Sequence, residues 1–372
     1  MYLWRFILCQ PRWITVKHMK TDDFLSWLSH AALVMVCTAL LLTSPMLQAH
    51  TEQPLEIGFR ERLLVLAPHP DDETLSAAGL IRQVFEHGGT VRTVVVTAGD
   101  AYVEAIQRDL GKRQLTKTDF LNYGEKRLAE SRSAAKVLGN GFIHLDLYGF
   151  SDGAIYPMLV SHWGRAHPDR SGFTGYSHVP YVEAEDKGIA QEGELLRNEL
   201  VNILRATKPT MIVFPDVMEN DSDHAGLGMF ALLAINDWLE HTTGAEPSPR
   251  LLAYLIHWQH DWPPGSDADQ PLDLSNQPLF LPDDLPLRGH KRACINLSVQ
   301  DRHLKREALA QYHTQQRAMG AFLSAFVHSN ECFTELNASD SKGIDNVVRQ
   351  WQHVRKAFDS HPISRRKIWQ LY

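Results

Sequence analysis

The chain has 372 residues, of which 44% are hydrophobic, so it is long enough to bury one large α/β core. Its 37 Lys and Arg residues against 44 Asp and Glu residues give a formal net charge of -7. No segment carries the dense basic stripe that nucleic-acid binding needs, and we therefore expect no nucleic-acid partner.

The first 49 residues have the pattern of an export signal. Lys20 precedes an apolar run over residues 31–42, and a small-residue end follows at Ala49. This run is shorter than the roughly 20 apolar residues of a membrane span. We therefore expect cleavage near His50 and an exported protein, periplasmic or secreted. A retained anchor is the alternative, in which case the uncleaved leader is the only expected membrane contact, and Met19 is a candidate for the true start.

From Arg62 onwards, apolar runs alternate with segments of helical period, which is typical of strands and crossover helices around a mainly parallel sheet. The pattern predicts strands over residues 63–67, 91–97, 142–147, 210–214 and 250–256. It predicts helices over residues 75–85, 123–138, 191–206 and 224–239. The expected fold class is α/β, with a Rossmann-like, mainly parallel sheet flanked by helices.

Two long irregular stretches, residues 149–186 and 258–289, interrupt this order. Loops of that length inside a compact domain are usually functional, and we expect both to wall a cleft at the carboxyl ends of the strands. Further on, Ser298 and Asp301 have the spacing of a capping box. The helix that they open is expected to carry three further residues, Lys305, Leu309 and Tyr312.

The last part of the chain has an apolar stripe at helical spacing, formed by Val347, Trp351, Val354 and Phe358. Docking onto the body of the protein is the favoured interpretation, with a partner or membrane surface as the alternative. The expected division is a signal peptide over residues 1–49, a main domain over residues 50–335 and a helical extension over residues 336–372.

Four cysteines occur, and Cys9 and Cys37 fall in the leader. The remaining two, Cys294 and Cys332, can form one disulfide in an oxidising compartment or remain two free thiols. The sequence leaves this choice open.

Residues 68–73 read Pro-His-Pro-Asp-Asp-Glu and lie directly between the first strand and its helix. Ligands of parallel sheets bind at this edge. His69 and Asp72, three residues apart on a tight turn, can converge on one metal, and Asp71 beside it can accept a proton from activated water. The alternative is structural, with Pro70 bending the chain and an Asp capping the helix.

A second polar run, residues 215–224, follows another buried strand and ends in His224. Two His residues and one carboxylate leave an open position for water and substrate, which is the pattern of a catalytic zinc site. Asp216, Asp221 and Asp223 can hold a ligand imidazole or can be loop and cap residues, and both interpretations stay open.

Residues 69–73, after an apolar strand, resemble the signature of the PIG-L (LmbE-like) deacetylases. Residues 127–130 match an Arg-x-x-Glu pattern, residues 149–153 a Gly-x-x-Asp-Gly turn, and residues 222–224 the end of a His-x-Asp-His motif. The resemblance covers roughly residues 62–315.

The resemblance implies a Rossmann-like fold and removal of acetyl groups from N-acetylglucosamine units. It implies three Zn²⁺ ligands, namely His69, Asp72 and His224. It also implies that Asp71 is the general base and that Arg127 and Asp152 contact the sugar. Fe²⁺ or another divalent metal also suits such ligands.

The sequence departs from the family at Asp221, which stands where the family commonly has the first His of His-x-Asp-His. That His is thought to protonate the leaving amine or stabilise the oxyanion, and an ionised Asp cannot do the second. His257, at the end of a strand, is a candidate catalytic replacement, and a packed structural His is the alternative.

The leading hypothesis is therefore a metal-dependent hydrolase that removes the N-acetyl group from an N-acetylated sugar, glycan or glycolipid, by zinc-activated water with Asp71 as general base. One alternative is a catalytically impaired glycan-binding protein that keeps the metal. Another is an esterase acting on O-acetylated sugars.

Overall fold

The computed structural model describes residues 52–139, 141–164, 166–185, 187–242, 248–259, 262–285 and 290–336. The described strands form one eight-stranded sheet in the order β1-β7-β8-β6-β5-β2-β3-β4. Their bounds are β1 Gln53–Pro54, β2 Arg62–Ala67, β3 Thr90–Thr97, β4 His144–Phe150, β5 Met211–Pro215, β6 Arg250–Tyr254, β7 Lys291–Asn296 and β8 Asn330–Leu336. The helices are α2 Asp72–Glu86, α3 Val103–Leu110, α4 Lys117–Gly139, α5 Ile155–Val160, α6 Gly193–Thr207, α7 Ser222–Glu240, α8 Val299–Leu309 and α9 His313–Ser324.

The sheet is mainly parallel and has a topological switch point. Strands β2 to β6 pair in parallel, and so do β1 and β7. Among the described strands, only β8 runs antiparallel to its neighbours, β6 and β7. The chain moves outwards from β2 to β3 and β4, and then returns to place β5 on the other side of β2. Ligands of such sheets bind outside the carboxyl ends of the strands at this reversal.

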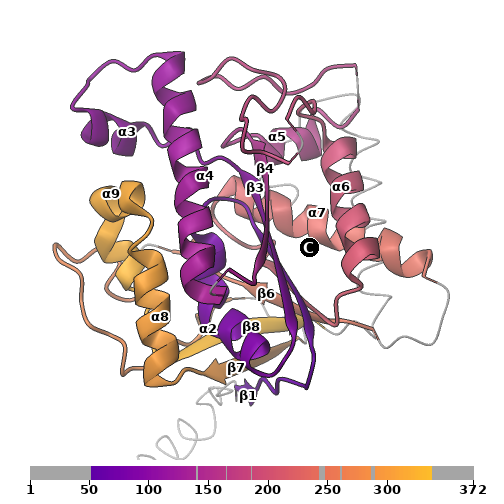
Figure 1. The fold of residues 1–372 in the computed structure, drawn as a ribbon, viewed down its shortest axis with the longest axis vertical. Coiled ribbons are helices and arrows are strands. Elements are labelled where there is room, and N and C mark those ends of the chain that lie inside the picture. Colours follow the sequence, from indigo (N-terminus) through magenta and orange to yellow (C-terminus); the bar gives the residue numbers. More distant parts are fainter. Residues whose placement is uncertain are drawn as a thin grey trace, which may run out of the picture. The chain divides into compact units, whose positions relative to one another are not determined.

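The central strands are apolar because both faces of the sheet are covered. Residues 63–67 of β2 and residues 211–215 of β5 are buried without exception. Helices α2, α4 and α8 contact one another on one side, while α6 and α7 pack together on the other, as Figure 1 shows. This arrangement confirms the predicted fold class.

Several predicted elements need correction. The strand predicted over residues 142–147 begins and ends later, as β4, His144–Phe150. It begins later because the exposed Phe142 lies in the turn after Gly139. Part of the stretch expected to be irregular therefore belongs to β4, and the short α5 follows it. The capping box at Ser298 and Asp301 is confirmed.

The helix behind that capping box is shorter than predicted. It ends at Leu309, so Tyr312 lies outside it at the start of α9. Helices α3 and α9 and strands β7 and β8 were not predicted. Between β7 and β8 the structure forms the Cys294–Cys332 disulfide, which resolves the choice that the sequence leaves open.

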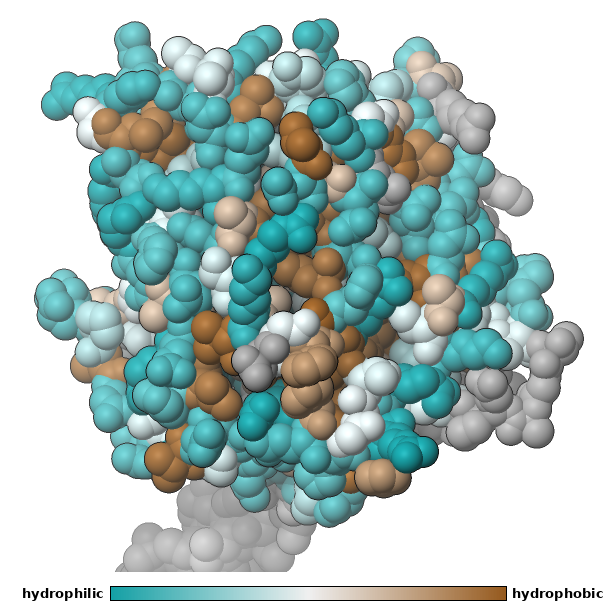
Figure 2. All heavy atoms as spheres, in the orientation of Figure 1, coloured by the Kyte–Doolittle hydropathy of each residue, from teal (hydrophilic) through white to brown (hydrophobic). Residues whose placement is uncertain are grey.

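The leader, including the predicted cleavage site, and the apolar stripe at residues 347–358 lie outside the described residues. Within the described part of the chain, no helix has the length and apolar character needed to cross a bilayer. On the face drawn in Figure 2, hydrophilic residues cover most of the surface and separate the hydrophobic patches from one another.

Candidate metal centre

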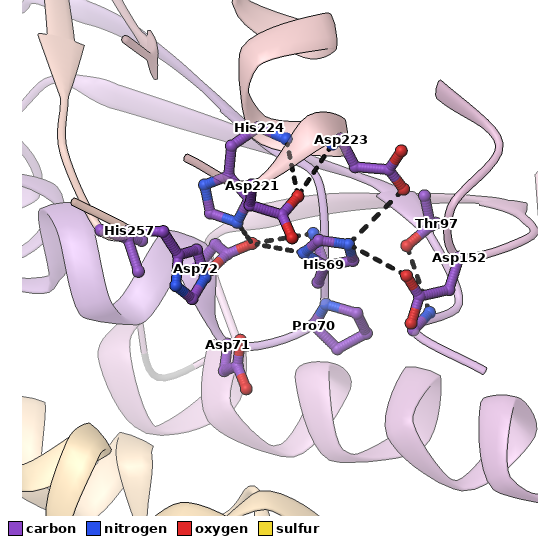
Figure 3. A network of polar contacts seen from close by, with 12 residues as sticks. His69, Pro70, Asp71, Asp72, Thr97, Asp152, Asp221, Asp223, His224 and His257 are labelled. Atoms are coloured by element: carbon purple, nitrogen blue, oxygen red, sulfur yellow. Dashed lines mark hydrogen bonds and ion pairs between the residues drawn. The ribbon is translucent and has the colours of Figure 1, made fainter. Parts of the chain in front are cut away.

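The candidate site lies where the loops after β2, β4, β5 and β6 meet. His69, Asp71 and Asp72 follow β2, Asp152 follows β4, and the run that ends in His224 follows β5. His257 comes just after β6. Figure 3 shows His69, Asp72, Asp152 and His224 pointing toward one another, with Asp71 set apart beside them. The position of the switch point predicts such a cluster.

Asp72 and the two histidines form the predicted triad. The Oδ2 atom of Asp72 lies 3.2 Å from Nδ1 of His69 and 3.1 Å from Nε2 of His224. All three ligand atoms lie within 4.8 Å of one another. Zinc bonds of roughly 2.0–2.2 Å place tetrahedral ligand atoms about 3.3–3.6 Å apart, so the donor set fits a small divalent cation.

The surroundings of His224 also fit a cation. Its side chain is completely buried, and among the described residues neither ring nitrogen makes a hydrogen bond, although two carboxylates lie close by. Burial lowers the pKa of His224, but Asp72 and Glu219 outweigh it and raise the pKa to about 10. A pocket that favours a proton at this imidazole by this margin also favours a metal ion that replaces the proton.

Glu219 faces Nδ1 of His224, and no sequence pattern singled it out. Its carboxylate lies 3.5 Å from Nδ1 of His224 and accepts hydrogen bonds from the backbone N–H groups of Ile256 and His257. Carboxylates in this position orient metal-binding imidazoles. The sequence does not distinguish Glu219 from the aspartates around it, because only the fold shows which carboxylate faces the His224 ring.

The opposite edge of His69 faces two other carboxylates. Its Nε2 atom lies 3.3 Å from Asp152 and 3.6 Å from Asp223. These three residues form a second group with metal-ligand spacing, but one neutral imidazole offers a single lone pair. The oxygens of Asp223 already accept hydrogen bonds from the backbone of Gly153 and Ile155, so we assign Asp223 to orienting His69 and the turn after β4.

Asp71 occupies a strained turn next to the triad. Its φ of 115° lies in the left-handed region, which costs a non-glycine residue of the order of 1–3 kcal/mol. The backbone N–H of Asp71 donates to Glu73, whose carboxylate is held by the hydroxyl of Tyr312. Burial raises the pKa of Asp71 to about 8, although the Arg127 guanidinium opposes this shift.

Arg127 is buried beneath this turn, with 4% of its surface exposed. It donates to the carbonyls of Pro70 and Gly99 and lies 3.3 Å from the Asp71 carboxylate. A Cβ atom at Gly99 would lie 2.0 Å from the guanidinium, which explains the glycine there. Arg127 therefore holds the Asp71 turn in place while also lining the cleft.

Asp221 and His257 lie beside the triad. Asp221 caps α7 by accepting from the backbone N–H groups of Asp223 and His224, and although burial opposes ionisation, the His224 and His69 charges lower its pKa to about 2. The His257 ring stands at 82° to that of His224, with 4.7 Å between centroids, and stacks on Phe322. Burial, assisted by the charge on His224, lowers the pKa of His257 to about 4.

A cleft of about 340 Å³ opens above these residues. The predicted site residues among its lining are His69, Asp71, Asp72, Arg127, Asp152, Asp221 and His257. His224 is buried below it, and Asp216 lies outside it, with its carboxylate accepting from the backbone of Met218. Part of the wall comes from α9, which the sequence did not reveal, through Gln315, Met319 and Phe322.

The fold and these donors define an α/β protein with a candidate metal centre at the switch point of its sheet. Residues 64–235 match the family described as PIG-L, GlcNAc-PI de-N-acetylase. This part of the chain is therefore a domain of the PIG-L family, which confirms the predicted resemblance. Among curated proteins, none matches the chain.

Several solved structures are similar to this chain at low identity. The A40926 pseudoaglycone deacetylase Dbv21 is 18% identical, with a TM-score of 0.47, covering 75% of this chain and 98% of that one. The N,N'-diacetylchitobiose deacetylase from Pyrococcus horikoshii is 16% identical, with a TM-score of 0.44, covering 75% of this chain and 85% of that one. The 4-carboxy-2-hydroxymuconate hydratase GalB from Pseudomonas putida is 15% identical, with a TM-score of 0.41 and coverages of 81% and 91%. Because one fold can host different reactions, these similarities do not assign an activity.

Proposed function

We propose that this protein is a metal-dependent hydrolase that removes the acetyl group from an N-acetylated amino sugar of a glycan or glycolipid. The observation that carries the proposal is the turn after β2. There Asp72 lies between two imidazoles while its neighbour Asp71 opens into the cleft. The match to a family described as a de-N-acetylase supports the same reaction.

His69, Asp72 and His224 would hold the metal, with zinc the favoured ion and Fe²⁺ an alternative. The metal would supply the positive charge that polarises an acetamide carbonyl and acidifies water. Asp71 then takes the proton from the attacking water and returns it to the departing amine. The raised pKa of Asp71 suits both steps, because the group must bind a proton and release it again.

Asp152 is the proposed sugar contact. One oxygen lies near His69 and the other accepts from the backbone N–H of Ala101. Its side chain keeps 20% of its surface exposed at the cleft, so it can still accept from a sugar hydroxyl.

We assign stabilisation of the oxyanion to His257 rather than to Asp221. The low pKa of His257 keeps its imidazole neutral near pH 7, and a neutral ring can donate an N–H to the developing oxyanion. Asp221 is ionised and already accepts from two backbone N–H groups, so it cannot donate in this way.

We further propose export to the periplasm or the exterior. The Cys294–Cys332 disulfide supports this location, since disulfides persist mainly in oxidising compartments. N-terminal sequencing of the protein in its native cell should begin near His50, and an intact leader in a soluble cytoplasmic fraction would contradict the proposal.

The decisive experiment compares acetate release by the wild type and by Asp71→Asn on a panel of N-acetylated glycans and glycolipids. Asn tolerates positive φ and keeps the size of Asp, but its amide cannot accept the water proton. The variant should keep its metal while kcat falls at least about 100-fold, as general bases typically contribute.

Asp216→Asn is the matched control, since it makes the same change at a buried carboxyl outside the cleft, and it should stay active. Near-normal turnover by metal-loaded Asp71→Asn would remove Asp71 from the mechanism. Acetate release from O-acetylated sugars alone would favour an esterase. A wild type that binds an N-acetylated glycan without releasing acetate would favour the binding-protein alternative.

A further inference from the structure

Helix α9, which forms one wall of the cleft, is broken in the middle. Met319 has non-helical dihedral angles, with φ at -147° and ψ at 39°. Just before the break, the carbonyls of Arg317 and Ala318 accept hydrogen bonds of 3.2 and 2.9 Å from the guanidinium of Arg108 on α3. Helices α3 and α9 therefore support each other at the position where α9 changes direction (Figure 1).

A second hollow of about 520 Å³ lies along this break. It is lined by residues 266–269 and Pro271, by Arg108, and by residues 316–322 of α9. Met319 and Phe322 line both this hollow and the cleft above the candidate metal centre. The two hollows therefore share these two side chains as a common border.

We call this second hollow the groove. Its lining has both hydrogen-bond donors and hydrogen-bond acceptors. Arg108 and Arg317 lie on the side of α3 and α9, and Asp267 and Asp269 lie on the opposite loop. Charges of both signs on facing walls disfavour a polyanion and a polycation alike. A neutral chain rich in hydroxyl groups, which both donate and accept, matches them better.

The border between cleft and groove is apolar. Phe322 and Met319 are only partly buried, and Phe322 is fixed by stacking on His257 with 5.4 Å between ring centroids. Binding sites for small molecules commonly combine such apolar surfaces with a few polar groups that set orientation. The apolar face of a pyranose ring can lie on these two side chains.

We propose that the groove is a second sugar subsite, which binds the saccharide units adjoining the N-acetylated unit in the cleft. The preferred substrate is then an uncharged oligosaccharide of two or more units rather than a single N-acetylated sugar. This inference rests on the proposed deacetylase function and adds the substrate class to it.

The test measures acetate release from N-acetylglucosamine and from tetra-N-acetylchitotetraose by the full protein with its metal. The tetrasaccharide should have a kcat/KM at least about 10-fold higher, which corresponds to about 1.4 kcal/mol of additional binding. Ala268→Trp, which fills the groove from its loop, should remove this advantage and leave turnover of the monosaccharide unchanged. Gln270→Trp is the control, because Gln270 is an exposed residue of the same loop that does not line the groove.

Equal kcat/KM values for both substrates, or an Ala268→Trp variant that keeps the full advantage, would overturn the subsite while leaving the proposed activity intact. If no substrate releases acetate, the proposed function fails, and calorimetric binding of the tetrasaccharide still tests the groove. Binding that weakens at least about 10-fold in Ala268→Trp supports the subsite. Undiminished binding, or none by the wild type, overturns it.

Discussion

Asp71 and Asp72 are neighbours with opposite electrostatic surroundings. Burial raises the pKa of Asp71 to about 8. Burial acts on Asp72 in the same direction, but the adjacent His224 and His69 outweigh it and lower the pKa of Asp72. Two carboxyl groups whose pKa values are driven apart can take different roles. Asp72 remains an anionic ligand, while Asp71 can take up and release a proton.

His257 gives the residue-scale prediction. His257→Phe keeps an aromatic ring against Phe322 and removes the N–H donor, so kcat should fall about 100- to 1,000-fold with little change in KM. His257→Gln should recover part of the loss, because an amide N–H can also donate. Steady-state kinetics on the best substrate of the panel measures both effects.

The pH profile separates this role from simple packing. Because the pKa of His257 is lowered to about 4, the ring is neutral above that pH, and His257→Gln should leave the profile between pH 6 and 8 unchanged in shape. Loss of an alkaline limb in His257→Gln would instead identify a protonated His257 as the acid. A His257→Phe enzyme with normal turnover would exclude both roles.

At this scale, the sequence revealed the residues that share one turn and missed those that act from a distance. His69, Asp71 and Asp72 lie within four positions of each other, so the motif alone brings them together. Glu219 faces His224 only because the loop after β5 bends back along β6, and Tyr312 reaches Glu73 across 239 positions. No periodicity or spacing encodes contacts of this kind.

At the scale of elements, α2 is interrupted just after the candidate ligands. Ala77 has non-helical dihedral angles. The Leu75 carbonyl and the Gly79 N–H, which would bond to each other in a regular helix, instead make hydrogen bonds to side chains. Lys305 donates to the Leu75 carbonyl at 2.7 Å, and Glu331 accepts from the N–H groups of Gly79 and Leu80 at 2.9 Å. Lys305 and Glu331 are 2.8 Å apart and buried, so they replace the missing part of the helix ladder.

Lys305→Met should therefore lower the free energy of unfolding by about 3–5 kcal/mol, since it leaves Glu331 as a buried charge without its cationic partner. Equilibrium urea unfolding provides the measurement. Arg306→Met is the matched control, because Arg306 is exposed on the same helix in an ion pair of 3.6 Å, and it should cost less than about 1 kcal/mol. Adding Glu331→Gln to Lys305→Met should restore part of the lost unfolding free energy. Equal losses of unfolding free energy in Lys305→Met and Arg306→Met would contradict the role assigned to Lys305 and Glu331.

The strands that the sequence predicted have apolar runs buried on both faces, such as β2 and β5. Strands β7 and β8 were missed because polar residues, some of them buried, such as Arg292, Asn330 and Glu331, interrupt their apolar residues. Helix α9 was missed for a related reason. It buries only Thr314, Gln315 and Leu323, while residues 316–322 line the groove.

At the scale of the whole molecule, the candidate ligands come from both sides of the switch point. His69 and Asp72 follow β2, and His224 follows β5. Strand β5 pairs with β2 but is separated from it in sequence by two strands and five helices. A bound metal would therefore connect the first half of the sheet to the second. Without it, carboxylates and imidazoles remain crowded in a buried space, where their charges need compensation.

Metal removal should accordingly destabilise the native protein as well as inactivate it. A ligand at 100 times its Kd stabilises the folded state by about 2.7 kcal/mol, so dialysis against a chelator should lower Tm by at least about 5 °C. Restoring zinc should reverse the shift, and elemental analysis should find one ion per chain. His224→Ala should bind no ion and show no rise in Tm with zinc. His303→Ala, at an exposed histidine on α8, should bind the ion and show the same rise in Tm as the wild type. A His224→Ala protein that still gains the full shift with zinc would show that the stabilising ion binds elsewhere.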